Sequence, residues 1–169
     1  MKKNKNRGKR FLPKKYELLN ETGRVQGVTV HRIRAIRRFG IVAKGTLGGF
    51  VESEHNLSHA GNCWVSCDAA VIGRARVLDD AFVGNFAVVS GAARVGGQAS
   101  LLDRARVSGK ARISGMAKIV RNADIRDQAC ISGSTLVGDR VRILGSCRLR
   151  GGVIIVPGAE KHLRKAAPR

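Results

Sequence analysis

The chain has 169 residues, a formal net charge of +20 and a pI near 11.3. A charge this large points to a polyanionic partner such as nucleic acid, a ribosome, an anionic membrane or an acidic glycan. No apolar run approaches twenty residues, which excludes a transmembrane helix, and the length fits one domain with tails. The basic start at Lys2–Arg10 is not followed by an apolar segment, so no secretory signal is expected.

Residues 1–15 carry eight basic side chains, no acidic one and almost no apolar content. This composition predicts a disordered arm. Such an arm can add affinity for phosphate groups with little specificity, and a tail that only keeps the protein soluble is the alternative. The arm residues that we assign to polyanion binding are Lys2, Lys3, Lys5, Arg7, Lys9 and Arg10.

Residues 16–62 show no short period and are predicted to form an N-terminal β cap on the segment that follows. Val28–Val30 and His31–Ile36 are rich in β-branched residues and are expected to form two short β segments; a helix over 30–39 is the alternative. Four glycines, at 40, 45, 48 and 49, separate them from a strand at Phe50–Val51. The cap residues assigned to polyanion binding are Arg32, Arg34, Arg37 and Arg38.

From Cys63 to residue 158 the sequence repeats every six residues through sixteen blocks. The third residue of a block is Val, Ile or Leu in all sixteen, the first is Ala in eleven, and the fifth is Gly, Asp or Asn in thirteen. A fixed short period of this kind is typical of a solenoid.

Each block predicts one short strand and one corner. The first and third residues point inward, because successive side chains of a strand alternate between its two faces. Gly, Asp or Asn at the fifth position suits a corner with unusual backbone angles. Three blocks then close a triangular coil of eighteen residues. The sixteen blocks make about five coils, a rod of roughly 25 Å at about 4.8 Å per coil.

An aliphatic residue every six positions resembles the hexapeptide repeat of left-handed parallel β-helices. The preceding segment, with Gly48–Glu54, Asn56–Ser58 and Gly61–Val65, is similar to a group of bacterial and phage hexapeptide-solenoid proteins that often carry a transferase label. The resemblance covers about residues 15 to 158. It implies an all-β, left-handed parallel β-helix, but Gly stands two residues after the aliphatic position rather than one, which departs from the acyltransferase pattern.

Residues eighteen apart should lie above one another, which sorts the outward residues onto three sides. The mixed side carries Ala70, Val88, Arg106, Asp124 and Arg142. The apolar side carries Trp64, Phe82, Leu102, Val120, Leu136 and Ile154, together with Ser100 and Lys118. The arginine side carries a ladder with one gap, at Cys130, and its members are Arg76, Arg94, Arg112 and Arg148.

Nothing in the fold requires arginine at these outward positions, and like charges in one column repel each other. Either the arginines only keep the strand surface soluble, or they bind a polyanion. The second interpretation is favoured because the arm, the cap, the ladder and the tail share one sign of charge. Guanidinium groups also grip phosphate oxygens in pairs. Aromatic residues are scarce, so contact is expected with backbone phosphates rather than with bases.

An apolar side of this extent is typical of an interface. Either residues 16–62 fold over it or subunits meet there. The hexapeptide resemblance implies a homotrimer, because β-helices of that type commonly form trimers. A protein partner on this side is a further alternative.

Catalysis is the runner-up function. Hexapeptide acyltransferases use a histidine as general base, and the four histidines here, at 31, 55, 59 and 162, all lie outside the sixteen blocks. His55 and His59 are the only candidate bases. His55-x-x-x-His59 and Cys63-x-x-x-Cys67 each lack further ligands, so no metal and no cofactor is expected. The four cysteines are expected to be reduced, in a cytoplasmic protein.

The sequence therefore predicts a cytoplasmic, non-catalytic β-solenoid that binds nucleic acid or a ribonucleoprotein. An active or degenerate acyltransferase and a phage- or host-directed protein-interaction module are the alternatives. Residues 159–169 are expected to form a basic tail that follows the last coil.

Overall fold

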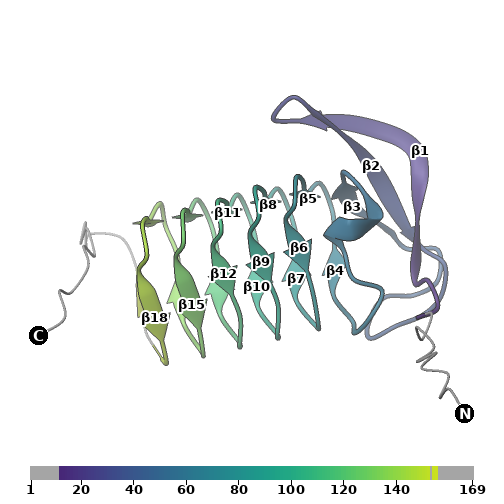
Figure 1. Ribbon diagram of the computed structural model, residues 1–169. Helices are drawn as coiled ribbons and strands as arrows, with labels where there is room; N and C mark the ends of the chain where they lie inside the picture. Colours follow the sequence, from purple (N-terminus) through teal and green to yellow (C-terminus); the bar gives the residue numbers. More distant parts are fainter. Residues whose placement is uncertain (1–11, 153, 156–169) are drawn as a thin grey trace, which may run out of the picture.

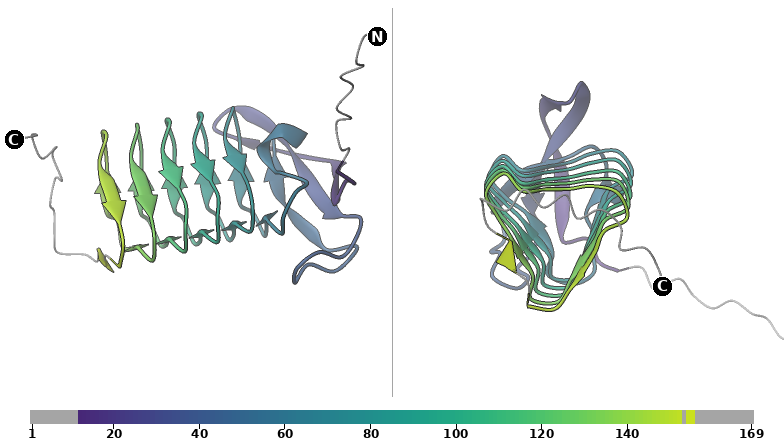
Figure 2. Two further views of the ribbon diagram at one scale, coloured as in Figure 1. Left: turned by 60° about the horizontal axis from the view of Figure 1, so that its bottom comes forward. Right: turned by 90° about the vertical axis from the view of Figure 1, so that its left-hand side faces the viewer.

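The structure is a computed structural model that describes residues 12–152 and 154–155. These residues form a rod of stacked turns with a hairpin at its N-terminal end (Figure 1). Viewed down the rod, the turns superpose in a nearly triangular outline, and the hairpin extends beyond it (Figure 2). The all-β solenoid predicted from the six-residue period is confirmed.

Each side of the triangle is a parallel sheet with one strand per turn. The arginine side contains β6 (Arg76–Val77), β9 (Arg94–Val95), β12 (Arg112–Ile113), β15 (Cys130–Ser132) and β18 (Arg148–Arg150). The apolar side contains β4 (Trp64–Val65), β7 (Phe82–Val83), β10 (Ser100–Leu101), β13 (Lys118–Ile119), β16 (Leu136–Val137) and β19 (Ile154–Ile155). The mixed side contains β3 (Leu47–Val51), β5 (Ala70–Val71), β8 (Val88–Val89), β11 (Arg106–Val107), β14 (Asp124–Ile125) and β17 (Arg142–Ile143).

The register between turns is eighteen residues throughout the repeat. Val77 pairs with Val95, and Leu101 pairs with Ile119, in neighbouring parallel strands. The backbone N–H of Arg94 donates to the carbonyl of Ala111 at 2.9 Å, and bonds of this kind recur at every turn. The repeat alone predicts about five turns, and β3 and the bridge of Leu57 to Val77 add two sides before the repeat, so the rod has about six turns.

Two of the three sides of the first turn come from the segment before Cys63. β3 pairs in parallel with β5, Leu57 forms a bridge to Val77, and β4 pairs with β7. Residues 47–65 thus build the first turn, although most of them do not follow the six-residue pattern. The parallel ladder, rather than the sequence period, decides where the solenoid begins.

The two inward positions of each block form the core. Alanines at the first position, from Ala69 to Ala129, are at most 1% exposed. Aliphatic residues at the third position are buried from Val65 at 0% to Ile143 at 3%, and Leu149 and Ile155 at the end of the rod are half-buried. A small residue beside a large one lets the three strands of a turn approach one another closely, so the interior contains no channel wide enough to need polar lining.

The fifth position of every described block has a positive φ angle, from Cys67 at 57° to Gly151 at 94°. At Gly109 a side chain would also collide with the turn below, because a Cβ there would lie 2.7 Å from the backbone nitrogen of Asp127. Gly, Asn and Asp adopt this conformation at the lowest cost. Arg121 adopts it as well, at 58°, which shows that the stacking of turns overrides local preference.

Acidic side chains at the corners join one turn to the next. Carboxylate oxygens of Asp79, Asp103 and Asp127 each accept a hydrogen bond, at 2.8–2.9 Å, from a backbone N–H eighteen residues further along. Glu52 accepts a similar bond from the N–H of Gly73 at 2.6 Å. These acids satisfy backbone donors of the corners.

The N-terminal cap is an antiparallel hairpin of β1 (Tyr16–Val25) and β2 (Val28–Ala35), and β2 also pairs antiparallel with β3. The β structure expected over residues 28–36 is confirmed, and the alternative of a helix is wrong. The structure has one continuous strand here, β2, where the sequence predicted two short segments. A short 3-10 helix, η1 (Glu54–Asn56), follows β3. Phe39 packs edge-on against Trp64 of the first turn, with ring centroids 5.4 Å apart, so the cap closes this end of the core.

Lys15 departs from the prediction that residues 1–15 are a disordered arm. Its side chain is fully buried, and the ammonium donates to the carbonyls of Cys63 at 2.9 Å and Gly61 at 3.1 Å. It also lies 4.9 Å from the centroid of the Phe39 ring. Residues 1–11 of the predicted arm lie outside the described residues.

The inward and outward assignment can be tested with two neighbouring residues. Ile113 is 1% exposed and Ser114 is exposed. Ile113→Asp forfeits about 1.5–3 kcal/mol of burial and leaves an unpaired charge in the core, so we expect an unfolded or insoluble protein. Ser114→Asp should remain folded, with a denaturant midpoint near that of the parent. Equal behaviour of the two variants in circular dichroism would show that the register is wrong.

Candidate polyanion-binding surface

The predicted arginine ladder is present as a straight column. Arg76 pairs in register with Arg94, Arg94 with Arg112, Arg112 with Cys130, and Cys130 with Arg148. All four arginines are exposed. At about 4.8 Å per rung the column is roughly 19 Å long. Short two-residue strands hold each arginine at the second position, where alternation points its side chain away from the buried third residue.

The ladder has no acidic counterpart among the residues that the structure describes. None of its four arginines forms an ion pair there, and the outward strand positions of this side contain no Asp or Glu. Exposed basic residues extend the charged area: Arg150 lies on β18, and Arg74 and Lys110 stand at the corner before this side. The ladder is therefore an uncompensated row of like charges.

Acidic residues elsewhere are engaged with the fold itself. Besides the corner carboxylates, Asp124 accepts a hydrogen bond from Arg126 at 2.8 Å, and Asp139 is paired with Arg121. These contacts raise the pKa of each arginine, through the hydrogen bond first, and lower the pKa of Asp139 in the same way. The negative charge of the rod is thus held at its corners and on the mixed side.

The four cap arginines fall into two pairs. Arg32 is half-buried: it donates to the carbonyls of Gly48 and Cys67, each at 3.0 Å, and lies 4.6 Å from the centroid of Phe50. Arg34 donates to Glu17 at 2.8 Å.

Arg37 and Arg38 are exposed, and Arg37 makes one long bond, 3.5 Å, to the carbonyl of Pro13. Of the four, Arg38 makes no side-chain hydrogen bond or ion pair with a described residue, and Arg37 would give up only this long bond to meet a polyanion. The arm residues Lys2, Lys3, Lys5, Arg7, Lys9 and Arg10 lie outside the described residues.

On the apolar side, Trp64 does not belong to the exposed surface. It is 2% exposed because Phe39 and Tyr16 of the cap pack against it. At this turn the cap lies over the apolar side, which is one of the two alternatives that the sequence left open. The cap covers this first turn alone. Further along the rod, Phe82, Leu102, Val120 and Leu136 are half-buried and Ile154 is 68% exposed.

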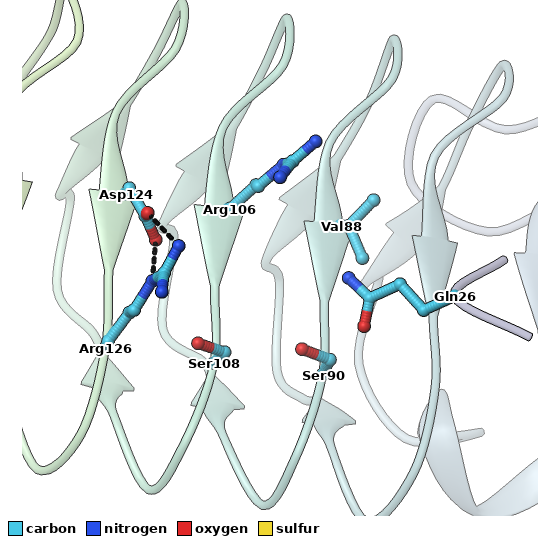
Figure 3. A pocket seen from close by; sticks show the side chains of 7 residues that line it. All are labelled: Gln26, Val88, Ser90, Arg106, Ser108, Asp124 and Arg126. Atoms are coloured by element: carbon cyan, nitrogen blue, oxygen red, sulfur yellow. Dashed lines mark hydrogen bonds and ion pairs between the residues drawn. The ribbon is translucent and has the colours of Figure 1, made fainter.

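The two best-defined hollows lie away from the arginine ladder. One, of about 230 Å³, is on the mixed side beneath Gln26 of the hairpin tip, and its floor includes Arg106, Ser108 and the Asp124–Arg126 pair (Figure 3). The other, of about 420 Å³, is a shallow corner depression beside Phe86 and Arg104. Neither hollow is lined by a histidine.

His59, one of the two candidate bases, is part of the cap packing. Its ring stacks on Tyr16 with centroids 4.4 Å apart, and its Nδ1 accepts the backbone N–H of Lys15 at 3.3 Å. Nε2 is buried without a hydrogen-bond partner and lies 4.0 Å from Glu54. Burial lowers the pKa of His59; Glu54 opposes this effect, and nearby lysines and Arg37 add to it. The other candidate, His55, is exposed on η1.

Cys63 beside this cluster is structural. Its thiol lies 3.3 Å from the Lys15 ammonium and is fully buried. Burial raises the pKa of Cys63 and lowers the pKa of Lys15. A thiol that is buried and kept protonated is a poor nucleophile, so this pair serves packing rather than catalysis.

All four cysteines are free, and the described residues contain no cluster of three potential metal ligands. No helix in the described part of the chain has the length and apolar character needed to cross a membrane. Comparison of the sequence with protein-family models and with curated proteins finds no match.

The depressed pKa of His59 predicts a pH-dependent stability. In the unfolded chain His59 binds its proton at about 6.5, whereas in the folded protein it does so only at lower pH. Unfolding therefore takes up a proton below about pH 6.5, and the free energy of unfolding should fall as the pH decreases from that value. His59→Asn should flatten this decrease in urea titrations between pH 7.5 and 5. His55→Asn is the matched control and should follow the parent; identical slopes in all three proteins would contradict the assignment.

The uncovered part of the apolar side predicts self-association. We expect light scattering to give a mass near three times 18.2 kDa. Leu102→Lys combined with Val120→Lys should yield a folded monomer, because both positions are half-buried and would bring unpaired charges into the contact. Ser90→Lys with Ser108→Lys on the mixed side adds the same charge and should leave the mass unchanged. A parent protein that is monomeric at micromolar concentration would refute a subunit contact here.

Proposed function

We propose that this protein is a non-catalytic binder of a polyanion, nucleic acid alone or within a ribonucleoprotein, through the arginine ladder and the basic arm. The observation that carries the proposal is the in-register column of Arg76, Arg94, Arg112 and Arg148, exposed and without an acidic partner among the described residues. Such a column is costly for an isolated protein, because each guanidinium repels the next. A bound polyanion removes that cost.

The distribution of charge supports the same proposal. The acidic side chains of the rod accept hydrogen bonds from corner N–H groups or pair with arginines of other sides, and in the described part of the chain none forms an ion pair with the ladder. Phosphates that meet this surface would release condensed counterions, which is the main source of sequence-independent affinity for nucleic acid. The free cysteines agree with a reducing compartment, which supports a cytoplasmic location for this binding.

Contacts with the backbone, not with base edges, are expected. Within residues 12–152, the arginine side is formed by short strands and their corners, without a helix that could enter a groove, and direct readout depends on such an element. Arginine forks on a flat surface are suited to phosphate oxygens. Binding should therefore show little sequence preference.

A second candidate function rests on the apolar side. The half-buried residues Phe82, Leu102, Val120 and Leu136 continue past the region that the cap covers. A homotrimer or a protein partner would cover them, and either is compatible with polyanion binding on a different side of the triangle. An acyltransferase has no comparable support, since both hollows lack a histidine.

The salt dependence of binding tests the primary proposal. Changing Arg76, Arg94, Arg112 and Arg148 to Gln removes four charges and nearly keeps side-chain length. The slope of log affinity against log salt concentration should become shallower by up to about 3–4 units, without a change in sequence preference. The control removes the same charge from exposed residues that form no ion pair, Arg24, Arg104, Arg140 and Arg142, and should change the slope far less.

Removing residues 2–10 takes away six further positive charges and should weaken binding while the circular dichroism spectrum is retained. Equal losses in the ladder and control variants would mean that a diffuse field, rather than the ladder, binds the anion. No binding of DNA or RNA at about 0.1 M salt by the parent protein would refute the nucleic-acid proposal.

A further inference from the structure

We infer that the preferred ligand is double-stranded nucleic acid, held by its sugar–phosphate backbone, rather than a single strand. This inference rests on the proposed function and narrows it. Three features of the arginine side carry it: the side is straight, it has no aromatic residue on which bases could stack, and it can hold a ligand through phosphate contacts alone, which favours the ligand with the denser phosphate charge.

Rigidity comes from the register. The ladder arginines sit in strands that backbone hydrogen bonds join to the neighbouring turns, such as Arg94 N–H to the Ala111 carbonyl and Ser114 N–H to the Ile131 carbonyl, both 2.9 Å. A column about 19 Å long that cannot bend suits a stiff partner, whose persistence length far exceeds that distance. A flexible single strand would lose conformational entropy on being straightened along the same column.

The absence of aromatic side chains argues against single strands. Proteins that bind single strands without sequence preference stack the bases on aromatic rings, each worth about 1–3 kcal/mol. No outward position on the arginine strands of the described chain carries an aromatic residue. The exposed ring of Phe86 belongs to the corner between the apolar and mixed sides, and Phe82 belongs to the apolar side. A single strand on the ladder would therefore gain phosphate contacts alone.

Charge density favours the duplex further. Double-stranded DNA carries one negative charge per about 1.7 Å of axis with both strands counted, so a stretch of about 19 Å presents about 11 charges. One strand supplies half of these. Each phosphate contact also releases more condensed counterion from a duplex than from a single strand, with salt slopes of about 0.9 and 0.7 per contact. For a surface that contacts phosphates only, both effects raise the affinity for the duplex.

Fluorescence anisotropy can test this with four probes of equal length: a 20-base-pair DNA duplex, the corresponding RNA duplex, and one separated strand of each. At about 0.1 M salt we expect the duplexes to bind at least tenfold more tightly than the strands. Comparison of the affinities for the two duplexes shows whether the protein prefers the B-form backbone of DNA or the A-form backbone of RNA. Arg94→Gln, and the fourfold ladder variant if it folds, should reduce the duplex affinity more than the single-strand affinity.

A gain-of-function variant gives an independent measurement. Ser114 is exposed on the arginine side beside Arg112, and Ser114→Trp would supply the missing stacking platform. It should raise the affinity for the single strands selectively and so reduce the duplex preference. Single strands that bind the parent as tightly as duplexes would overturn the inference while leaving polyanion binding intact. Failure of all four probes to bind would instead overturn the proposed function, and the inference with it.

Discussion

Backbone hydrogen bonding between strands paired in an eighteen-residue register is the constraint on which the rest of this structure depends. It fixes the spacing of the turns, and it aligns each outward side chain with its counterpart in the next turn. A column of one residue type in the sequence is thereby converted into a column in space. In most folds, arginines separated by eighteen residues would scatter over the surface; here they form one row.

The same constraint governs how charge is distributed. The tight corners leave backbone N–H groups that need acceptors, and carboxylates at the fifth position supply them. Acidic residues are therefore found mainly at the corners of the triangle. The charge of each flat side is set by the outward residues at the second and fourth positions of its blocks. An overall excess of basic residues then becomes concentrated on one side, with little local compensation. The potential of the arginine side is a result of fold geometry as much as of composition.

Sequence reasoning succeeded where the chain is periodic. The buried pairs such as Ala111 and Ile113, the positive φ angles of the fifth position and the alignment of the ladder all follow from a six-residue period and three sides per turn. These features depend on local alternation and on one repeated contact, so each block predicts the next.

It failed where contacts are unique. Three features of the cap each depend on a single tertiary arrangement that a repeated pattern cannot predict. They are the long strand β1, the burial of Lys15 under the loop at Gly61 and the packing of Phe39 over Trp64. The division of the cap arginines has the same origin, since Arg32 and Arg34 meet their glutamates only after the hairpin has formed. Composition alone marks all four arginines as equally available.

The repetition of one turn also makes the length of the surface a discrete quantity. Because neighbouring turns contact only each other, stability in a solenoid is close to a sum over turns and their interfaces. Insertion or removal of one complete eighteen-residue unit from the middle of the rod keeps every corner, every inward pair and the cap in place. Such a change lengthens or shortens the ladder by a single rung. The footprint of this protein on a linear partner is thus adjustable in steps of one arginine, without redesign of the core.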